Sequence, residues 1–287
     1  LQMVWVDREG GEIAAIGPPQ DSLAWPAVSP DGKLVAVSAN SEETRDNIWI
    51  HDTVRGTRTR LTFASEGDWA PAWFPDGRRL AFGQSFGTNA RILSVPVDRS
   101  ADPIELAKGE IPDVSPDGAS ILFELRTEGA DDNLYSANAK EASEPTLFLA
   151  TVLDEEHAQI SPDGSYVAYS SEESGRGEIY LMRFPEGVGK WQVSIDGGNW
   201  ARWNPAGGEI FFLAGDDLMV VEVDLGETPQ LGTPQPLVSV PDGGLLSEPP
   251  RPYDVDHDGS RFVMLKGVSK AEQPSLTYVE NWAMALR

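Results

Sequence analysis

Three observations predict an all-β fold built from repeats. The 287-residue chain contains 28 glycines and 22 prolines, and short alternating apolar stretches bounded by turn residues dominate it. A Pro-Asp-Gly turn recurs along the chain, with its glycines 45, 41, 46, 43 and 52 residues apart. Such a period, with only strand signals inside it, is typical of a propeller blade of four strands. The sequence therefore predicts a six-bladed β-propeller with four-stranded antiparallel blades.

The recurring turn marks the repeat units. It occurs at residues 29–32, 74–77, 115–118 and 161–164, with degenerate copies at 204–207 and 256–259. Proline presets φ at the first central position, aspartate bonds the backbone ahead of it, and glycine supplies a positive φ. We therefore expect a structural role, not a catalytic one, for the turn aspartates Asp31, Asp76, Asp117, Asp163 and Asp258.

Apolar columns on both sides of the turn predict the strands. The column four residues before each glycine consists of Val28, Trp73, Val114, Ile160, Trp203 and Val255. The columns three and five residues after it are Val35, Leu80, Ile121, Val167, Ile210 and Phe262, then Val37, Phe82, Phe123, Tyr169, Phe212 and Met264. Columns two residues apart describe one buried face of a strand. Each unit is thus predicted to run as inner strand, turn and second strand.

Two further strands complete most units. Third strands are expected at 47–50, 133–135, 178–181 and 217–220, and fourth strands at 60–63, 104–106, 146–149 and 191–193. The sixth unit lacks a fourth strand, and residues 3–6 and 12–16 can supply the missing strands of one closing blade, which removes open sheet edges. Leu276–Val279 leaves one strand in excess, which adds a fifth strand to the closing blade unless residues 282–287 cap the ring.

The repeats account for the whole chain. We predict a single domain over residues 1–287, with repeat units at roughly 24–63, 68–107, 110–150, 156–194, 199–240 and 252–287 plus 1–17.

The repeat resembles that of a known family. Residues 25–38, followed by 47–52 and 60–62, resemble the WD-like propeller repeat of the bacterial TolB family. Residues 4–10, 189–194 and 279–282 are similar to the TolB-like propellers that follow many bacterial serine/threonine protein kinase domains. The resemblance implies a sensor or protein-binding propeller, often beyond a membrane span, and therefore an extracytoplasmic location.

The kinase itself is not encoded here. The sequence has no Gly-rich nucleotide loop and no His-Arg-Asp catalytic loop, so kinase activity would lie outside this chain. Because the chain opens at Leu1 rather than Met, we expect it to be a fragment or a processed product.

Composition excludes several classes of function. Lys and Arg number 22 against 46 Asp and Glu, and the resulting net charge of −24 argues against nucleic acid and anionic membrane surfaces as partners. No apolar run reaches the roughly 18 residues of a membrane span, so direct membrane insertion is not expected. The absence of Cys removes disulfides, thiolate catalysis and Cys-ligated metals.

The metal signals are weak. His51, His157 and His257 lie in different repeats at non-equivalent positions, which does not suit a metal-ligand set. Residues 254–259 match the first six positions of a calcium loop, but the twelfth position is Leu265 where a bidentate Glu belongs. We therefore expect neither a metal nor another cofactor.

A polar column on the inner strands is the best candidate site. Five residues before each turn glycine stand Ala27, Ala72, Asp113, Gln159, Arg202 and Asp254. Inner strands line the central channel, so mixed carboxylate, amide and guanidinium groups there suit a small polar ligand or ordered water. Aromatic residues enter the same strands at the face opposite the turns: Trp25, Trp69, His157, Trp200 and Tyr253. Aromatics with an Arg near a cleft are the usual anchors of recognition surfaces.

Two interpretations of these residues remain open. In one, they form a binding mouth; in the other, the aromatics cover the wedges between blades and the polar column holds channel water. The first predicts a non-enzymatic recognition, sensor or scaffold propeller of a bacterial signalling or envelope protein, which binds a protein or small polar ligand at the channel mouth. The alternative function is a lactonase-like or lyase-like enzyme that uses carboxylates such as Asp113 and Asp254, with or without a metal.

Overall fold

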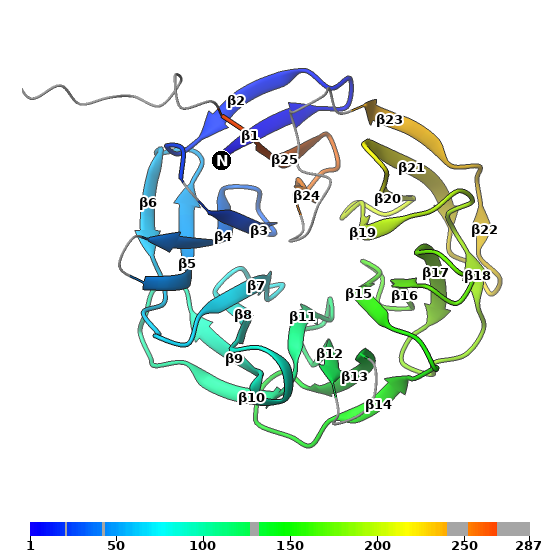
Figure 1. The fold of residues 1–287 in the computed structure, drawn as a ribbon, viewed down its shortest axis with the longest axis horizontal. Coiled ribbons are helices and arrows are strands. Elements are labelled where there is room, and N and C mark those ends of the chain that lie inside the picture. Colours follow the sequence, from blue (N-terminus) through cyan, green and yellow to red (C-terminus); the bar gives the residue numbers. More distant parts are fainter. Residues whose placement is uncertain (21, 42–43, 127–131, 240–251, 269–287) are drawn as a thin grey trace, which may run out of the picture.

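Six antiparallel sheets are arranged as blades around a central axis (Figure 1). This computed structural model describes residues 1–287 except 21, 42–43, 127–131, 240–251 and 269–287. Each blade has four strands in antiparallel order, and one blade carries a fifth. The predicted six-bladed propeller with four-stranded antiparallel blades is therefore confirmed. No helix among the described residues is long and apolar enough to cross a membrane.

The strands of blades 1 to 5 follow chain order from the axis outward (Figure 1). Blade 1 contains β3 (Leu23–Val28), β4 (Leu34–Ser41), β5 (Thr44–Asp52) and β6 (Thr57–Arg60). Blade 2 contains β7 (Asp68–Trp73), β8 (Arg79–Gln84), the 3-10 helix η1 (Gly87–Asn89), β9 (Arg91–Pro96) and β10 (Ile104–Lys108). Blade 3 contains β11 (Glu110–Val114), β12 (Ser120–Arg126), β13 (Asp132–Asn138) and β14 (Thr146–Leu149). Blade 4 contains β15 (Glu155–Ile160), β16 (Tyr166–Ser171), β17 (Glu178–Arg183) and β18 (Trp191–Gln192). Blade 5 contains β19 (Asn199–Trp203), β20 (Glu209–Ala214), β21 (Asp217–Asp224), β22 (Gln230–Leu231) and β23 (Gln235–Ser239).

Blade 6 joins the two ends of the described chain. It contains β24 (Tyr253–Val255), β25 (Arg261–Lys266), β1 (Gln2–Asp7) and β2 (Glu12–Ile16). Strand β1 pairs with β25 without interruption, from Gln2 opposite Lys266 to Asp7 opposite Arg261. The predicted closure by N- and C-terminal strands in one blade is confirmed. The excess strand expected at 276–279 lies outside the described residues.

Two outer strands differ from the expectation. Strand β6 covers Thr57–Arg60, not 60–63, although the Leu61 N–H still donates to the Ile48 carbonyl of β5 at 2.8 Å. Leu61 is buried in the core, and the Thr62 hydroxyl accepts the Ile48 N–H at 3.0 Å. In blade 5 the eight-residue β21 is long enough to pair with two short strands, β22 near one end and β23 near the other.

The turns have the predicted chemistry. The six turn glycines Gly32, Gly77, Gly118, Gly164, Gly207 and Gly259 have φ between 64° and 81°. Each turn aspartate accepts the backbone N–H two residues ahead, at 2.9–3.1 Å. These bonds confirm the structural role of the five aspartates, because they fix the backbone that a glycine with positive φ completes.

The core consists of wedges between neighbouring blades. All twelve residues of the two apolar columns that follow the turns are at most 1% exposed. Between blades 6 and 1, for example, Met3, Trp5 and Val263 pack against Val35 and Val37. Ring closure is therefore a packing event as well as a strand pairing.

Replacement of Trp5 should weaken this closure. Trp5 is 3% exposed and the Arg261 guanidinium lies 4.0 Å from its ring centroid. We expect Trp5→Ala to lower the free energy of unfolding by about 3–5 kcal/mol, the usual cost of a large aromatic truncation in a core. Urea denaturation followed by tryptophan fluorescence and circular dichroism measures it. Ile13→Ala on β2, at a site 52% exposed, is the control and should change stability by about 0.5 kcal/mol or less. Equal losses in both variants would contradict the closure role.

Candidate functional site

A bulge interrupts the inner strand of five blades. Seven residues before the turn glycine the backbone is left-handed: Trp25 (φ 57°), Ala70 (49°), Ile111 (47°), His157 (57°) and Trp200 (58°). The pairing register shifts at each of these residues. A bulge re-aims its side chain, and a non-glycine residue in this region costs about 1–3 kcal/mol. The surrounding packing must hold it there.

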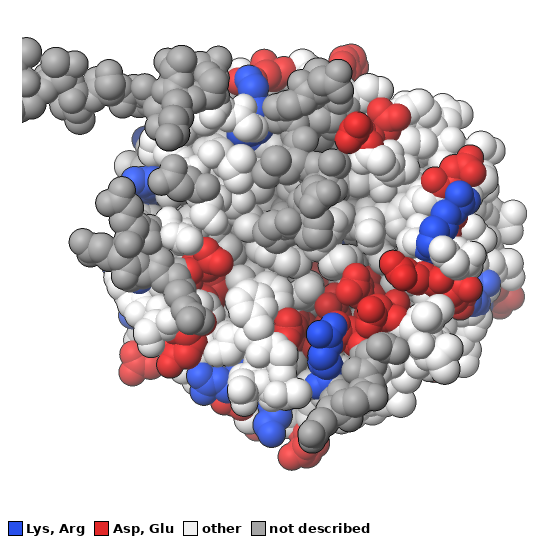
Figure 2. All heavy atoms as spheres, in the orientation of Figure 1, with Lys and Arg blue, Asp and Glu red and all other residues white. Residues whose placement is uncertain are grey.

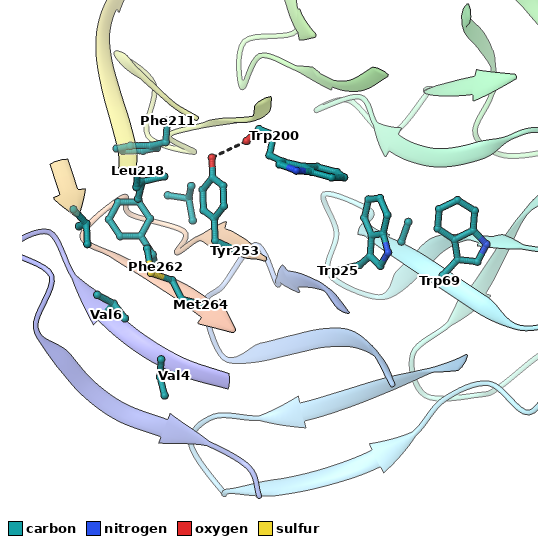
Figure 3. Packing of buried hydrophobic residues seen from close by; sticks show 13 residues of the cluster. Val4, Val6, Trp25, Trp69, Trp200, Phe211, Leu218, Tyr253, Phe262 and Met264 are labelled. Carbon is teal, nitrogen blue, oxygen red and sulfur yellow. Dashed lines mark hydrogen bonds between the residues drawn. The ribbon is translucent and has the colours of Figure 1, made fainter. Parts of the chain in front are cut away.

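The bulged residues bring the predicted aromatics together at the axis. The centroid of the Trp25 ring lies 5.5 Å from that of Trp69 and 5.2 Å from that of Trp200, both edge to face (Figure 3). The His157 ring lies 3.4 Å from the Trp200 ring. We call these four residues the axial aromatic cluster. The Tyr253 hydroxyl donates to the Trp200 carbonyl at 2.7 Å. All five side chains are at least nine-tenths buried. This burial favours the packing interpretation for the aromatics, and their binding role stays a prediction.

The polar column lines a pocket at the other end of the inner strands. This channel pocket has a volume of about 400 Å³, and Asp113, Gln159, Arg202 and Asp254 form its wall. Its inner end reaches Ile111 and His157. Its outer edge consists of turn residues: Pro30, Pro75, Pro116, Pro162, Pro205 and His257. The pocket therefore opens on the turn side, whereas the expected mouth lay on the opposite side.

The bulge explains this difference. It turns the side chains of Trp25 and Trp200 onto the axis, where they fill the space opposite the turns. The residues two positions after the bulge line the channel pocket, which lies nearer to the turns. The turn prolines have a second role beyond the turns. Because each turn follows a strand that lines the channel, its proline also lies at the edge of the channel opening.

Three members of the polar column also join neighbouring blades. Each uses a side-chain oxygen to accept the N–H of the next blade, four residues before that blade's turn glycine. The bonds are Asp113 Oδ2 to Ile160 N (2.8 Å), Gln159 Oε1 to Trp203 N (2.7 Å) and Asp254 Oδ2 to Val28 N (2.8 Å). An inner strand has no neighbouring strand on the channel side, so these N–H groups need acceptors from elsewhere. Polar residues in the column one position earlier supply them.

Indole groups reinforce the same junctions. Trp73 Nε1 donates to the Ala27 carbonyl at 2.9 Å, which joins blades 1 and 2 where the polar column has only alanine. Trp203 Nε1 donates to the Gln159 carbonyl at 3.1 Å. The fourth polar member, Arg202, places Nε 3.5 Å from Asp254 Oδ1 on the next blade. The polar column is thus both a pocket wall and a set of inter-blade contacts.

Acidic residues gather at the opposite end of blades 3 and 4. Figure 2 shows acidic side chains concentrated over β11 and β15. Glu110 and Glu124 face each other across β11 and β12, and Glu124 accepts the His157 N–H at 2.6 Å. Burial raises the pKa of Glu124 well above its usual range. Burial, with the negative charges of Asp154 and Asp132, raises the pKa of Glu156 to about 7. The bond from Glu124 links this acidic group to the axial aromatic cluster.

The histidine and calcium-loop residues are placed separately. His51 is buried in β5, where desolvation, with the Arg58 charge, lowers its pKa to about 4. Asp254 points into the channel and bonds Val28 instead of joining the other carboxylates of the predicted loop. The side-chain oxygen and nitrogen atoms of Asp256, His257 and Asp258 that could bind a metal lie within 4.8 Å of one another. However, Arg261 Nε already donates a hydrogen bond to Asp256 Oδ2 at 2.6 Å.

With this geometry the chain can be compared with known proteins. No protein-family model matches it. The Tol-Pal system protein TolB of Alcanivorax borkumensis is 30% identical over 80 residues, which are 28% of this chain and 18% of that protein. The chain is similar to TolB. Its match spans less than a fifth of the length of this curated relative.

Solved structures extend the similarity to the whole fold. A putative TolB from Agrobacterium tumefaciens superposes with a TM-score of 0.66 at 18% identity, over 93% of this chain and 98% of that one. TolB from Acinetobacter baumannii gives 0.60 at 18% identity, over 95% of this chain and 63% of that one. The predicted resemblance to TolB-like propellers is confirmed. An oligogalacturonate lyase in complex with manganese also superposes, with a TM-score of 0.61 at 15% identity over 96% of this chain and 80% of that one.

Loss of an inter-blade contact should destabilise the ring. Asp254→Ala removes the acceptor of Val28 N–H and the carboxylate beside buried Arg202, so we expect a loss of about 3 kcal/mol in the free energy of unfolding. Asp254→Asn keeps an oxygen for Val28 and should lose about 1 kcal/mol. Asp196→Ala, at a solvent-exposed carboxylate, is the control. Urea denaturation measures all three, and an Asp254→Ala variant as stable as the control would refute the contact's role.

The buried carboxylates should make stability depend on pH. The pKa of Glu156 is about 7 in the folded protein against an ordinary 4.5, so folding favours the protonated form. Its stabilising contribution is complete below about pH 4.5 and is lost as the pH rises through 7. Glu156→Gln stays neutral, so its stability relative to the parent should rise by about 1 kcal/mol between pH 4.5 and 8, a figure reduced because the side chain is 38% exposed. Urea denaturation at several pH values measures this, with Glu227→Gln on an exposed loop as the control. Parallel profiles for Glu156→Gln and the parent would show that Glu156 does not contribute.

Proposed function

We propose that this chain is a non-enzymatic recognition propeller that binds a protein or small polar ligand at the channel pocket. The observation that carries the proposal is the pocket itself, a cavity of about 400 Å³ with carboxylate, amide and guanidinium groups on one wall. Binding sites are usually concave, with a few placed polar groups among apolar ones. Here the turn prolines supply the apolar edge and the polar column supplies the polar groups.

The similarity to TolB supports a binding role over catalysis. The relative over 80 residues is a Tol-Pal system protein, and this similarity supports the proposal of an extracytoplasmic envelope propeller. A net charge of −24 favours a basic or polar partner over an acidic one. A sensor propeller next to a kinase domain, as the resemblance implied, is one form of this function.

A lyase-like or hydrolase-like activity is the second candidate. Asp113 and Asp254 line the same pocket, and a manganese-bound oligogalacturonate lyase shares the fold. However, each carboxylate already holds the backbone of a neighbouring blade, and Arg202 lies beside Asp254. These contacts favour recognition, because a catalytic carboxylate has to reach substrate.

A turnover screen separates the two candidates. Generic esters, lactones and oligogalacturonate are offered to the protein with and without Mn²⁺ and Ca²⁺. We expect no turnover above the buffer rate. Turnover that Asp113→Ala abolishes, while the variant remains folded by circular dichroism, would reverse the order of the two proposals.

Photo-crosslinking tests binding on the turn side. Benzoylphenylalanine replaces Pro75 or Pro116 at the pocket edge, or Leu147 on the outer strand β14 as the control. All three positions are exposed. After irradiation in living bacteria we expect discrete adducts from the two edge positions and none from Leu147. Adducts from the outer strand alone would place the binding surface elsewhere.

A further inference from the structure

We propose that the channel pocket binds a small zwitterion, namely a free α-amino acid with an apolar side chain. This inference rests on the proposed function, because it takes the channel pocket to be the binding site. It adds the chemical class of the ligand, which follows from how polar and apolar groups divide around the axis.

The pocket has one polar side and one apolar side. Gln159, Arg202 and Asp254 hold the same repeat position in blades 4, 5 and 6, which follow one another around the ring (Figure 1). We call these three residues the polar arc. The same position in blades 1 and 2 is Ala27 and Ala72. A ligand that fills this pocket therefore meets charge on one side and methyl groups on the other.

The polar arc retains hydrogen-bonding capacity after the blades are joined. Gln159 Oε1 accepts the backbone N–H of Trp203, and Gln159 Nε2 donates to no described residue. Arg202 donates Nη1 to the Ala201 carbonyl, and its Nε has no hydrogen-bond partner among the described residues although the side chain is only 4% exposed. A buried donor without an acceptor is costly. Both groups call for a ligand with acceptor oxygens.

A carboxylate fits those donors best. Guanidinium groups bind carboxylates through parallel N–H···O bonds, and the adjacent Gln159 amide can donate to the same group. A simple anion would nevertheless meet two like charges in the pocket, Asp113 and Asp254. The lining of two carboxylates and one guanidinium is net negative with neutral histidines, which disfavours an anion alone.

An ammonium group on the same ligand resolves this conflict. Asp254 Oδ2 accepts the Val28 N–H, while among the described residues Oδ1 has only the 3.5 Å contact with Arg202 Nε. An ammonium beside Asp254 and a carboxylate beside Arg202 would place each charge against its opposite on adjacent blades. The two charges of an α-amino acid are close enough for this. A cation alone would leave the buried Arg202 Nε–H without an acceptor among the described residues.

The apolar side of the pocket selects the rest of the ligand. Ala27 and Ala72, in blades 1 and 2, lie across the ring from blades 4 and 5, and Pro71 beside Ala72 also belongs to the lining. An apolar side chain there removes its surface from water against methyl and ring groups. The volume of about 400 Å³ lies near the lower end of small-molecule sites, about 300–1,000 Å³, which suits a single amino acid.

Calorimetric titration of the full chain tests the ligand class. The probes are L-leucine, L-valine and L-phenylalanine, with isoamylamine and 4-methylpentanoate as leucine analogues that lack the carboxylate or the ammonium. We expect saturable binding of at least one amino acid, and at least tenfold weaker binding of both single-charge analogues to a protein that binds leucine. No heat from any of the three amino acids at 10 mM, or an analogue that binds as well as leucine, would overturn the proposal.

Two variants locate the site. Arg202→Met removes the guanidinium at similar length, and Ala72→Leu fills the apolar side without touching the polar arc. Ala72→Leu should weaken amino-acid binding at least tenfold with a melting temperature close to that of the parent. Arg202→Met should weaken binding as much and should also lower the melting temperature, because it leaves Asp254 without its guanidinium partner. Ala15→Leu on the exposed face of β2 is the matched control and should bind as the parent does. If Arg202→Met fails to fold, Ala72→Leu decides alone, and unchanged binding in that variant overturns the proposal.

The two proposals fail in different ways. Photo-adducts from Pro75 and Pro116 without amino-acid binding would leave the recognition function in place and refute the zwitterion. Amino-acid binding that Ala72→Leu does not affect would place the ligand outside the channel pocket and likewise refute the inference.

Discussion

A left-handed residue seven positions before the turn glycine of blades 1 to 5 sets the interior of this propeller. The bulge at Trp25, Trp200 and their equivalents turns large side chains onto the axis at one end of the ring. Each such residue costs about 1–3 kcal/mol in backbone strain, and burial of a large apolar side chain returns about the same. The mutual ring contacts of Trp25, His157 and Trp200 hold the bulges of blades 1, 4 and 5 in place. Beyond the bulge the axis opens into the channel pocket.

The polar column shows how one set of side chains joins neighbouring blades and lines the channel pocket. One side-chain oxygen of Asp113, of Gln159 and of Asp254 accepts a backbone N–H from the next blade. Their remaining polar atoms, with Arg202, face the pocket. Blades 1 and 2 have alanine at this position, and Trp73 joins them instead through its indole N–H. The pocket is consequently asymmetric within a nearly symmetric ring, and this asymmetry gives it a polar and an apolar side.

The same device appears on the opposite side of the bulge. Glu110 accepts the Gly87 N–H of blade 2, and Glu124 accepts the His157 N–H of blade 4. Carboxylates are therefore retained between blades 2, 3 and 4 although burial disfavours their charge and raises the pKa of both. The acidic composition is thus more than a solvated surface, since some of its members fasten the backbone of adjacent blades. Their protonation links the packing of His157 to pH.

The sequence alone determined the number of blades, the turn chemistry and the closing blade, because turn spacing and a period of two report directly on chain reversal and on which strand face is buried. It also placed Asp113, Gln159, Arg202 and Asp254 on the channel wall. Tertiary structure decided what periodicity does not carry. The bulge is a backbone conformation adopted by Trp, Ala, Ile and His alike, so residue type did not reveal it. Whether the axis is filled or open at a given end depends on side chains from several blades meeting at one point. Spacing along the chain does not report which side chains from different blades meet. For this reason the sequence did not predict that the pocket opens among the turns.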